Sequence, residues 1–323
     1  MSSKIEKSAT KNSGNNKTAS AKPFLKWAGG KGQLLESFLK FYPEELLQKQ
    51  IKHYYEPFVG GGAVFFYVAQ QFEIERAYLF DINAELTLTY KVVQSEVQKL
   101  IDYLRQYRDI YNGLDTEQQK QFYYKLRTIF NENLTKINNS HFSEDWIERA
   151  AQVIFLNKTC FNGLFRTNLK GEFNVPAGRY KNPRILDEAN LRKASDVLSV
   201  AEIFTSDFKS VEMKVKKNSF VYFDPPYRPL NKTSSFTAYS KNSFTDKEQI
   251  ELAHLFQRLD KNGIKLMLSN SDPKNINSED DFFDRLYKNF KILRIPAKRM
   301  INSKSTGRQE INEILVANYP CKY

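Results

Sequence analysis

The sequence predicts an α/β fold whose core is interrupted by a large insert. A strand-like run at 52–59 is followed by three glycines, a helical run and a second strand-like run at 77–81, which together form a βαβ pattern. Long helical patterns then replace the strand alternation, and strand-like runs return only in the last third of the chain. We therefore expect a core built from 23–84 and 190–323, with an insert at 85–189.

The insert is predicted to be mainly helical, with a hairpin near its end. Its Gly, Asn and Pro content between 158 and 184 indicates turns and a hairpin rather than one continuous element. Apolar residues at helical spacing predict three helical stretches: Ala84 to about Tyr111, Thr116 to about Phe130, and about Glu144 to Asn157.

The last third of the chain returns to the core. A helical pattern at 245–260 lies between two of its strand-like runs. The expected strands are 202–207, 219–224, 264–270, 290–295 and 313–319.

The charge of the chain favours an anionic partner. Lys and Arg number 49 against 37 Asp and Glu, which gives a formal net charge of +12 in 323 residues. This balance does not distinguish DNA, RNA and acidic lipid. No apolar run approaches the roughly 20 residues that a membrane span needs, so we expect no membrane partner.

Composition also argues against disulfides and a metal centre. Cys160 and Cys321 are the two cysteines, too few for a disulfide framework or a thiolate zinc cluster, which suits a reducing cytosol. The three histidines share no ligand-like spacing. Residues 1–22 are rich in Ser, Lys, Asn and Thr and lack the apolar stretch of a signal peptide, which predicts a disordered basic tail.

Two consecutive prolines close the strand-like run at 219–224. Pro225 and Pro226 cannot donate sheet hydrogen bonds, so the strand has to end at Asp224, next to Tyr227. An acidic residue, a backbone carbonyl without a strand partner and an aromatic ring then meet at the carboxyl edge, where ligands bind in open α/β sheets. A proline-rich turn closed by an exposed tyrosine is the alternative.

The glycines after the first strand form a second candidate site. Three glycines between a strand and a helix let a ligand approach the backbone and the free N–H groups of the helix. Asp81 closes the next strand 19 residues after Gly62, a position that suits hydrogen bonds to ribose hydroxyls. Neither GxGxxG nor GxxxxGK[ST] is present, so a nucleoside without a phosphate chain is favoured. The alternative is a tight structural turn.

Two further segments carry side chains suited to binding a cofactor or a nucleic acid. Trp27 and Lys31 flank a glycine pair in 23–35 and offer an apolar face and a cation for a carboxylate, although a short helix with a buried Trp would look the same. The stretch 158–184 combines six basic side chains and one acidic one with four aromatic rings. Such a hairpin suits nucleic-acid reading, because Arg pairs with guanine and aromatic rings wedge between bases; a solvated loop is the alternative.

Together these segments predict chemistry on a nucleobase. A base has to leave the helical stack before a protein can modify it, and its pocket needs a stacking ring and acceptors for the exocyclic amine. Tyr227 supplies the ring, while the Asp224 carboxylate and the Pro225 carbonyl supply the acceptors. Such acceptors draw the amine nitrogen toward a geometry that can attack an electrophilic methyl group held in line.

Five motifs resemble those of a known family, in family order: FLKWAGGK, EPFVGGGAVFF, FDIN, FDPPY and LSNSD. They are similar to motifs of the Dam-like, α-class (D12 type) DNA adenine-N6 methyltransferases, including GATC-methylating members of restriction-modification systems. The resemblance runs from about residue 23 to the C-terminus. It implies a Rossmann-like core with a mixed, mostly parallel sheet covered by helices on both faces, and a helical and hairpin target-recognition domain. It also implies S-adenosyl-L-methionine as the cofactor.

Carried over by position, the resemblance assigns the central site. Trp27 and Lys31 would contact the cofactor, Asp81 its ribose, and Asp207 and Phe208 are candidates for its adenine moiety. The cofactor-binding candidates are Trp27, Lys31, Pro57, Gly60, Gly62, Asp81, Asp207, Phe208 and Asp224. The catalytic candidates are Asp224, Pro225, Pro226 and Tyr227.

The hairpin resembles the recognition hairpin of enzymes that methylate adenine in GATC. Leu164 and Pro176 would contact the thymine, and Arg166 would read the guanine opposite the final cytosine. Relatives can carry Tyr where this chain has Phe161, so this position keeps an aromatic ring that can act as a wedge but lacks the hydroxyl. The DNA-binding candidates are Lys26, Phe161, Asn162, Leu164, Arg166, Asn168, Pro176, Arg179, Tyr180 and Lys181, of which Lys26, Tyr180 and Lys181 would engage the first base pair.

The resemblance predicts a cytoplasmic prokaryotic enzyme that acts on double-stranded DNA as a monomer or weak dimer. A cognate restriction endonuclease would act on the same site without a stable complex. Three alternatives remain: a solitary or phage adenine methyltransferase, a methyltransferase of cytosine N4 or RNA adenine, and a nucleic-acid-binding protein without catalysis. The hairpin argues against the second, and the presence of Asp81, Asp224 and Tyr227 against the third.

Overall fold

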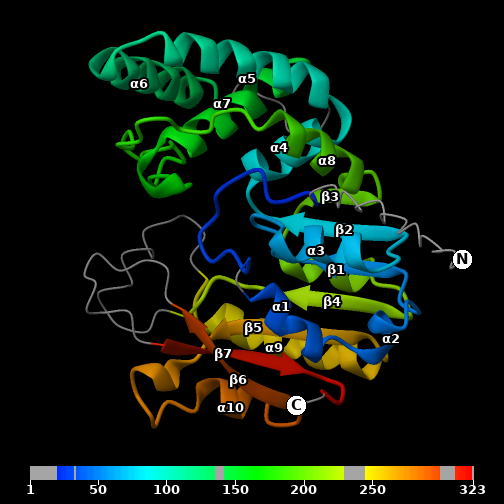
Figure 1. Cartoon of the computed structure of the whole chain (residues 1–323). Helices are drawn as coiled ribbons and strands as arrows, with labels where there is room; N and C mark the ends of the chain where they lie inside the picture. The colour runs from blue at the N-terminus through cyan, green and yellow to red at the C-terminus, as the bar shows by residue number, and fades with distance from the viewer. Residues whose placement is uncertain (1–19, 33, 135–141, 229–243, 299–309, 322–323) are drawn as a thin grey trace, which may run out of the picture.

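A computed structural model describes residues 20–32, 34–134, 142–228, 244–298 and 310–321. Within this part, seven strands form one sheet (Figure 1): β1 (His53–Glu56), β2 (Arg76–Asp81), β3 (Ala201–Thr205), β4 (Ser219–Phe223), β5 (Lys265–Ser271), β6 (Lys291–Lys298) and β7 (Glu310–Ala317). Their order is β3-β2-β1-β4-β5-β7-β6. The first five strands pair in parallel, and β7 is antiparallel to both β5 and β6. The predicted mixed, mostly parallel α/β sheet is therefore confirmed.

Helices cover both faces of the sheet and form the insert above its β3 edge (Figure 1). They are α1 (Leu35–Phe38), α2 (Glu44–Leu47), α3 (Ala63–Gln71), α4 (Ala84–Ser95), α5 (Val97–Asn112), α6 (Thr116–Glu132), α7 (Asp145–Thr159), α8 (Glu188–Leu198), α9 (Asp246–Lys261) and α10 (Phe282–Leu286). Short 3-10 turns include η2 (Phe161–Gly163), η3 (Phe208–Met213) and η5 (Pro273–Asn275).

The central strands alternate between two apolar cores. Along β4, Phe220 and Tyr222 face the core that contains α3 and α4, whereas Val221 and Phe223 face the core that contains α9. All five residues of this strand are buried. Burial on both faces explains the continuous run of β-branched and aromatic residues at 220–223 of β4, because parallel strands covered by helices need no polar face.

The helical pattern from Ala84 to Tyr111 is divided into two helices, α4 and α5. Glu96 separates them, with φ −130° and ψ 35°. α4 packs on β2 and β3 as well as on α7, whereas α5 packs on the helices α6, α7 and α8, so the two helices follow different surfaces. Neither Gly nor Pro lies at the break, so the sequence pattern does not reveal it. The sequence patterns also do not predict α8, which packs on α4.

A buried ion pair joins α7 to α4, the helix of the insert that packs on β2 and β3. Arg149 of α7 is 1% exposed, and its guanidinium donates to both carboxylate oxygens of Glu85 on α4, at 2.8 and 2.6 Å. The same guanidinium donates to the Phe130 carbonyl and stacks on the Phe130 ring. A bidentate pair of this kind fixes the two helices in orientation as well as distance.

The start of the chain is anchored from residue 21. The Ala21 N–H donates to the Gln70 side chain and the Lys22 N–H to Asn190. The rest of the tail predicted for 1–22 lies outside the described residues, apart from residue 20. No helix in the described ranges is long and apolar enough to cross a membrane.

Candidate functional site

Asp224 lies where the sequence places it, directly after β4 at the carboxyl edge of the sheet. Its Oδ1 accepts a hydrogen bond from the Ser269 hydroxyl at 3.0 Å and lies 2.7 Å from the Lys31 ammonium. Ser269 in turn lies 2.8 Å from the Tyr222 hydroxyl, behind the edge. The carboxylate is thereby fixed in position while part of it stays exposed.

Lys31 connects the N-terminal glycine segment to this edge. Its ammonium is buried, donates to the Gly29 carbonyl at 3.2 Å and to the Tyr227 hydroxyl, and lies 4.5 Å from the centre of the Tyr227 ring. Burial and the nearby Asp224 charge raise the pKa of the Tyr227 hydroxyl well above its ordinary value, so this group stays neutral. Residues 31, 224 and 227, predicted from separate motifs, therefore form one cluster.

The turn after Asp224 is supported from α9 and β5. Gln249 of α9 donates to the Pro226 carbonyl at 3.1 Å, and Asn270 of β5 donates to Gln249 at 3.3 Å. Among the described residues, none donates to the Pro225 carbonyl. Pro225 is buried and Pro226 exposed. The Pro226 carbonyl is therefore occupied, whereas the neighbouring Pro225 carbonyl is available to accept a hydrogen bond.

The glycine turn after β1 fits closely around Trp27. A Cβ atom on Gly60, whose φ is +47°, would lie 2.8 Å from the Trp27 ring, so only glycine allows this packing. Gly62 is the N-cap of α3, with φ +70°, and a Cβ there would clash with the Tyr90 hydroxyl. Pro57, which precedes the turn, is buried. These positions bring the two glycine-rich motifs into direct contact.

Asp81 lies at the end of β2, facing this turn. It accepts hydrogen bonds from the Gly60 N–H at 3.1 Å and the Asn83 N–H at 2.9 Å. Burial raises the pKa of the Asp81 carboxyl, and the two hydrogen bonds oppose that rise. Asp207 is exposed after β3 and caps η3, whereas Phe208 is buried and stacks on Phe58 at 5.3 Å.

The predicted hairpin region follows α7 and lies over the side to which β2 and β4 point (Figure 1). Two antiparallel bridges, Cys160 with Ala177 and Thr167 with Phe173, bring its two arms together. Asn168 closes the tip by accepting from the Lys170 and Glu172 N–H groups. The structure therefore forms a hairpin here with bridges rather than an extended ladder.

The DNA-reading candidates lie along this hairpin. Phe161 is 50% exposed, beside Asn162 in the left-handed conformation at φ 56°. Arg166 is exposed and donates to the Asn174 side chain at 2.8 Å. Leu164 is half-buried and Pro176 exposed. The hairpin thus presents an aromatic ring and an oriented guanidinium to solvent.

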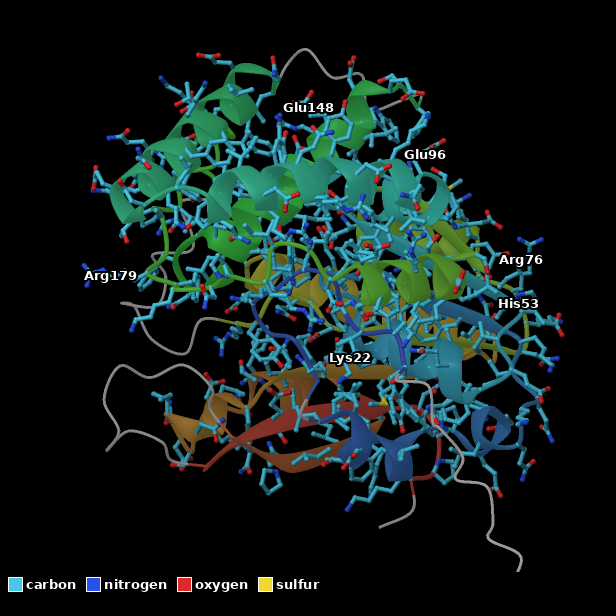
Figure 2. The ribbon with its side chains drawn as sticks, turned by 45° about the horizontal axis from the view of Figure 1, so that its top comes forward. Lys22, His53, Arg76, Glu96, Glu148 and Arg179 are labelled. Atoms are coloured by element: carbon cyan, nitrogen blue, oxygen red, sulfur yellow. The ribbon has the colours of Figure 1, made fainter. Side chains whose placement is uncertain are left out.

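The remaining basic candidates lie beside the hairpin. In Figure 2, Arg179 projects at one margin of the molecule, opposite His53 and Arg76 at the amino ends of β1 and β2. The Lys26 ammonium lies 4.4 Å from the centre of the Tyr180 ring and 3.4 Å from its hydroxyl, while Lys181 is exposed.

Lys158 is a further cation that the site prediction missed. Burial, with help from the Lys26 charge, lowers its pKa to about 8, and Arg184 acts in the same direction. Its position in the 158–184 cluster was evident from the sequence, but its burial was not. A half-buried ammonium next to other cations favours binding of an anion such as a phosphate group.

Two contacts that sequence reasoning missed join the hairpin to the glycine motifs. Asn157 of α7 is fully buried, accepts from the Lys26 N–H at 2.8 Å, and donates to the carbonyls of Lys26 and Gly163 at 2.9 Å each. Trp27 stacks on Phe165 at 5.6 Å, with an interplanar angle of 22°. The residue type of an isolated Asn or Phe carries no signal of such long-range contacts.

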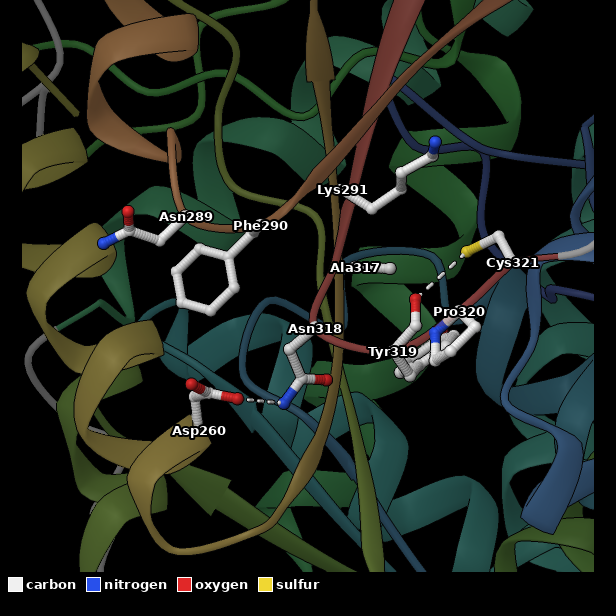
Figure 3. A pocket seen from close by; sticks show the side chains of 9 residues that line it. All are labelled: Asp260, Asn289, Phe290, Lys291, Ala317, Asn318, Tyr319, Pro320 and Cys321. Atoms are coloured by element: carbon white, nitrogen blue, oxygen red, sulfur yellow. Dashed lines mark hydrogen bonds between the residues drawn. The ribbon is translucent and has the colours of Figure 1, made fainter.

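A surface hollow of about 460 Å³ lies elsewhere (Figure 3). It is lined at the amino end of β6 and the carboxyl end of β7, which antiparallel pairing places away from Asp224. The Asn318 side chain in this hollow donates a hydrogen bond to Asp260 at 2.7 Å and accepts one from the Leu266 N–H, so its role is structural. Within the described residues, no group of His, Cys, Asp and Glu side chains is arranged to hold a metal ion.

The sheet order, the Asp-Pro-Pro-Tyr edge and the glycine turn facing Asp81 define a Rossmann-like methyltransferase fold. A family profile described as D12 class N6 adenine-specific DNA methyltransferase matches residues 27–301. The chain belongs to this family and is an adenine-specific DNA methyltransferase.

Named relatives match over nearly the whole chain. Type II methyltransferase M.MjaIII of Methanocaldococcus jannaschii is 52% identical over 299 residues, covering 92% of this chain and 99% of the relative. Type II methyltransferase M1.LlaDCHI of Lactococcus lactis subsp. cremoris is 37% identical, covering 92% and 95%. DNA adenine methylase of Escherichia coli strain K12 is 33% identical, with the same coverage of 92% and 95%.

Proposed function

We propose that this enzyme transfers a methyl group from S-adenosyl-L-methionine to N6 of adenine in GATC sites of double-stranded DNA. The observation that carries the proposal is the convergence of Asp224, Lys31 and Tyr227 at one sheet edge, beside a hairpin that presents Arg166 and Phe161. Residues 23–84 and 190–323 would form the catalytic part and residues 85–189 the recognition part.

The residues at the glycine turns fit the proposed cofactor. Asp81 offers a carboxylate for ribose hydroxyls, and the exposed Ile82 next to it offers an apolar surface for a base. Gly62 has no side chain to cap the start of α3, and the Phe65 N–H is engaged by Glu56, so the Ala63 and Val64 N–H groups are the ones that would serve a polar ligand. When bound, S-adenosyl-L-methionine would supply an electrophilic methyl group.

The protein's own part in transfer is to hold and polarise the target amine. Tyr227 would stack against the flipped base, and Asp224 with the Pro225 carbonyl would accept the two amine hydrogens. These hydrogen bonds would raise electron density on N6, so that its lone pair could form the new N–C bond while the bond from the methyl carbon to the sulfonium sulfur breaks and its electron pair stays on sulfur. The amine then gives up one proton to reach the neutral product, and the partly exposed Asp224 carboxylate provides a route for it to solvent.

The hairpin and its surroundings supply recognition. Phe161 would wedge into the stack near the flipped adenine, and Arg166, held by Asn174, would pair with the outer guanine. Lys158 and Lys26 would contact phosphate and the first base pair, respectively. This division separates sequence reading from electrostatic attachment.

The proposed biological role is protection within a restriction-modification system. It is supported by the names of two relatives, which are Type II methyltransferases. A cognate endonuclease would act on the same sites without a stable complex, and the enzyme would work on cytoplasmic DNA as a monomer or weak dimer. A solitary adenine methyltransferase is the second candidate, supported by the relatives named DNA adenine methylase.

One experiment tests the sequence specificity. The protein is expressed in a methylation-deficient host, and plasmid from that host is digested with one endonuclease blocked by GATC adenine methylation and one that requires it. We expect resistance to the first and cleavage by the second. Full sensitivity to the first enzyme, with N6-methyladenine present elsewhere in the plasmid, would contradict the GATC assignment.

A substitution tests the active edge. Asp224→Ala removes the amine acceptor and should abolish methylation while DNA affinity stays within about twofold of wild type, because the DNA contacts lie mainly on the hairpin. The exposed Glu202→Gln variant on β3 serves as control. Methylation by Asp224→Ala at the wild-type rate would remove Asp224 from the mechanism.

A further inference from the structure

Lys31 lies between two carboxylates at unequal distances. Its ammonium is 2.7 Å from Asp224 Oδ1 and 3.9 Å from Glu313 Oε2, a distance too long for a hydrogen bond. In the described part of the chain, Glu313 Oε2 is buried and has no hydrogen-bond partner. A buried carboxylate oxygen left without a partner is costly, so this one calls for a functional explanation.

The position of Glu313 follows from the direction of its strand. Because β7 is antiparallel to β5, the first residues of β7 reach the edge where the parallel strands end. Glu313 is opposite Ser271 of β5 and Ile295 of β6. An acidic side chain near the start of the last strand therefore enters the site around Asp224.

The contact between Lys31 and Asp224 opposes the proposed chemistry. Asp224 has to attract the hydrogens of the target amine, and an ammonium at 2.7 Å withdraws negative charge from it. Lys31 also keeps Tyr227 in place, so the lysine cannot simply leave the site. A second anion close to Lys31 resolves this conflict, because a small shift transfers the ammonium from one carboxylate to the other.

We propose that Glu313 is a positioning residue that takes over the Lys31 ammonium when the target adenine engages Asp224. The inference rests on the proposed role of Asp224 as the amine acceptor. In the structure described above, Lys31 neutralises Asp224. With adenine in place, Lys31 pairs with Glu313, and Asp224 is free to polarise N6. The Lys31 charge is thereby moved away from Asp224 for the reaction.

The charged and titratable groups that face Glu313 support this exchange. They are Lys31 from the N-terminal segment, and Asp224 and Tyr227 from the turn after β4. Burial raises the pKa of Glu313, while the Lys31 charge and the nearby Tyr227 hydroxyl oppose the rise. Glu313 therefore takes up its proton at a higher pH than an exposed glutamate. Protonation removes the charge that attracts Lys31.

The test compares Glu313→Gln, Glu313→Asp and the exposed control Glu202→Gln with wild type. Single-turnover formation of N6-methyladenine is measured by mass spectrometry on unmethylated plasmid, which contains adenine in every context. DNA affinity and the thermal midpoint are measured alongside. We expect Glu313→Gln to lower the single-turnover rate by about 10- to 100-fold, with DNA affinity and midpoint near wild type. Glu313→Asp should restore part of the rate.

The pH dependence separates a charge-based role from a merely structural one. The wild-type rate should rise with pH as Glu313 loses its proton, and Glu313→Gln should lack this dependence. A Glu313→Gln variant with the wild-type rate and pH profile would overturn the proposal, as would a rate loss matched by equal losses in DNA affinity and midpoint. Mapping the methylated sites tests GATC separately, because methylation elsewhere would contradict the proposed target and leave the Glu313 comparison valid.

Discussion

Trp27 stacks face to face on Phe165, with their ring centroids 5.6 Å apart. Trp27 lies in the first glycine motif and Phe165 in the hairpin, 138 positions along the sequence. Gly60 and Gly61 are packed against the same tryptophan. The surface proposed to bind the cofactor and the segment proposed to read DNA therefore share one aromatic contact.

Phe165→Ala should weaken cofactor binding although the residue belongs to the hairpin. Loss of an aromatic pair removes about 0.5–1.5 kcal/mol, which corresponds to an about twofold to tenfold higher dissociation constant if Trp27 loses its orientation. Isothermal titration with S-adenosyl-L-methionine, in the absence of DNA, measures the dissociation constant. The exposed Phe142→Ala variant is the matched control. An unchanged constant would mean that Trp27 is oriented without Phe165.

Asn157→Ala should destabilise the protein more than a typical polar substitution. The change removes three hydrogen bonds of a fully buried amide and leaves the Lys26 and Gly163 backbone groups unpaired. We expect a loss of about 2–4 kcal/mol in the free energy of unfolding. Urea unfolding measures it, with the exposed Asn182→Ala as control. Equal stability of the two variants would show that water replaces the lost contacts.

DNA affinity should fall as the pH rises through about 8. The lowered pKa of Lys158 means that its ammonium is charged below that pH and neutral above it, and phosphate attraction requires the charged form. Fluorescence anisotropy with a labelled duplex at fixed salt, between about pH 7 and pH 9, measures the effect. Lys158→Met should bind more weakly at pH 7 and lose this dependence. If the DNA affinity of Lys158→Met depended on pH as steeply as that of wild type, the effect would belong to another group.

Arg166→Ala should relax the choice of the outer base pair. A bidentate contact with guanine contributes about 1–3 kcal/mol of discrimination between bases. Without it, methylation of sites with a substituted outer base pair should increase relative to methylation of GATC. Asn174→Ala should have a smaller effect of the same kind, because Asn174 orients the guanidinium. Competition between GATC and single-substitution duplexes measures the ratio. Equal losses on every duplex would instead identify Arg166 as a phosphate contact.

The sequence predicted the features that depend on local patterns. The run of buried residues in β4, the prolines after Asp224 and the glycines before α3 constrain the backbone directly, so their placement at the sheet edge was confirmed. The ends of the strands differed by a few residues from the expected ranges. The roles proposed for these residues stay predictions.

What the sequence did not reveal depends on partners far along the chain. Glu313 enters the site because β7 is antiparallel, and a strand pattern does not show direction. The break at Glu96 separates α4, which packs on the sheet as well as on α7, from α5, which packs on the helices α6, α7 and α8, and neither Gly nor Pro marks it. Asn157 and Phe165 acquire their importance from Lys26 and Trp27, more than 130 positions away.

The buried pair of Arg149 and Glu85 has a consequence for how specificity can change in this family. Helices of the insert share one continuous apolar core with the sheet, and this pair ties α7 to α4, the helix of the insert that packs directly on β2 and β3. Exchanging the whole insert for that of a relative would bring together two halves of a core that were never matched. The hairpin tip, closed locally by Asn168, is free of that constraint. New recognition sequences should therefore arise by substitution within the hairpin rather than by transplanting the insert as a module.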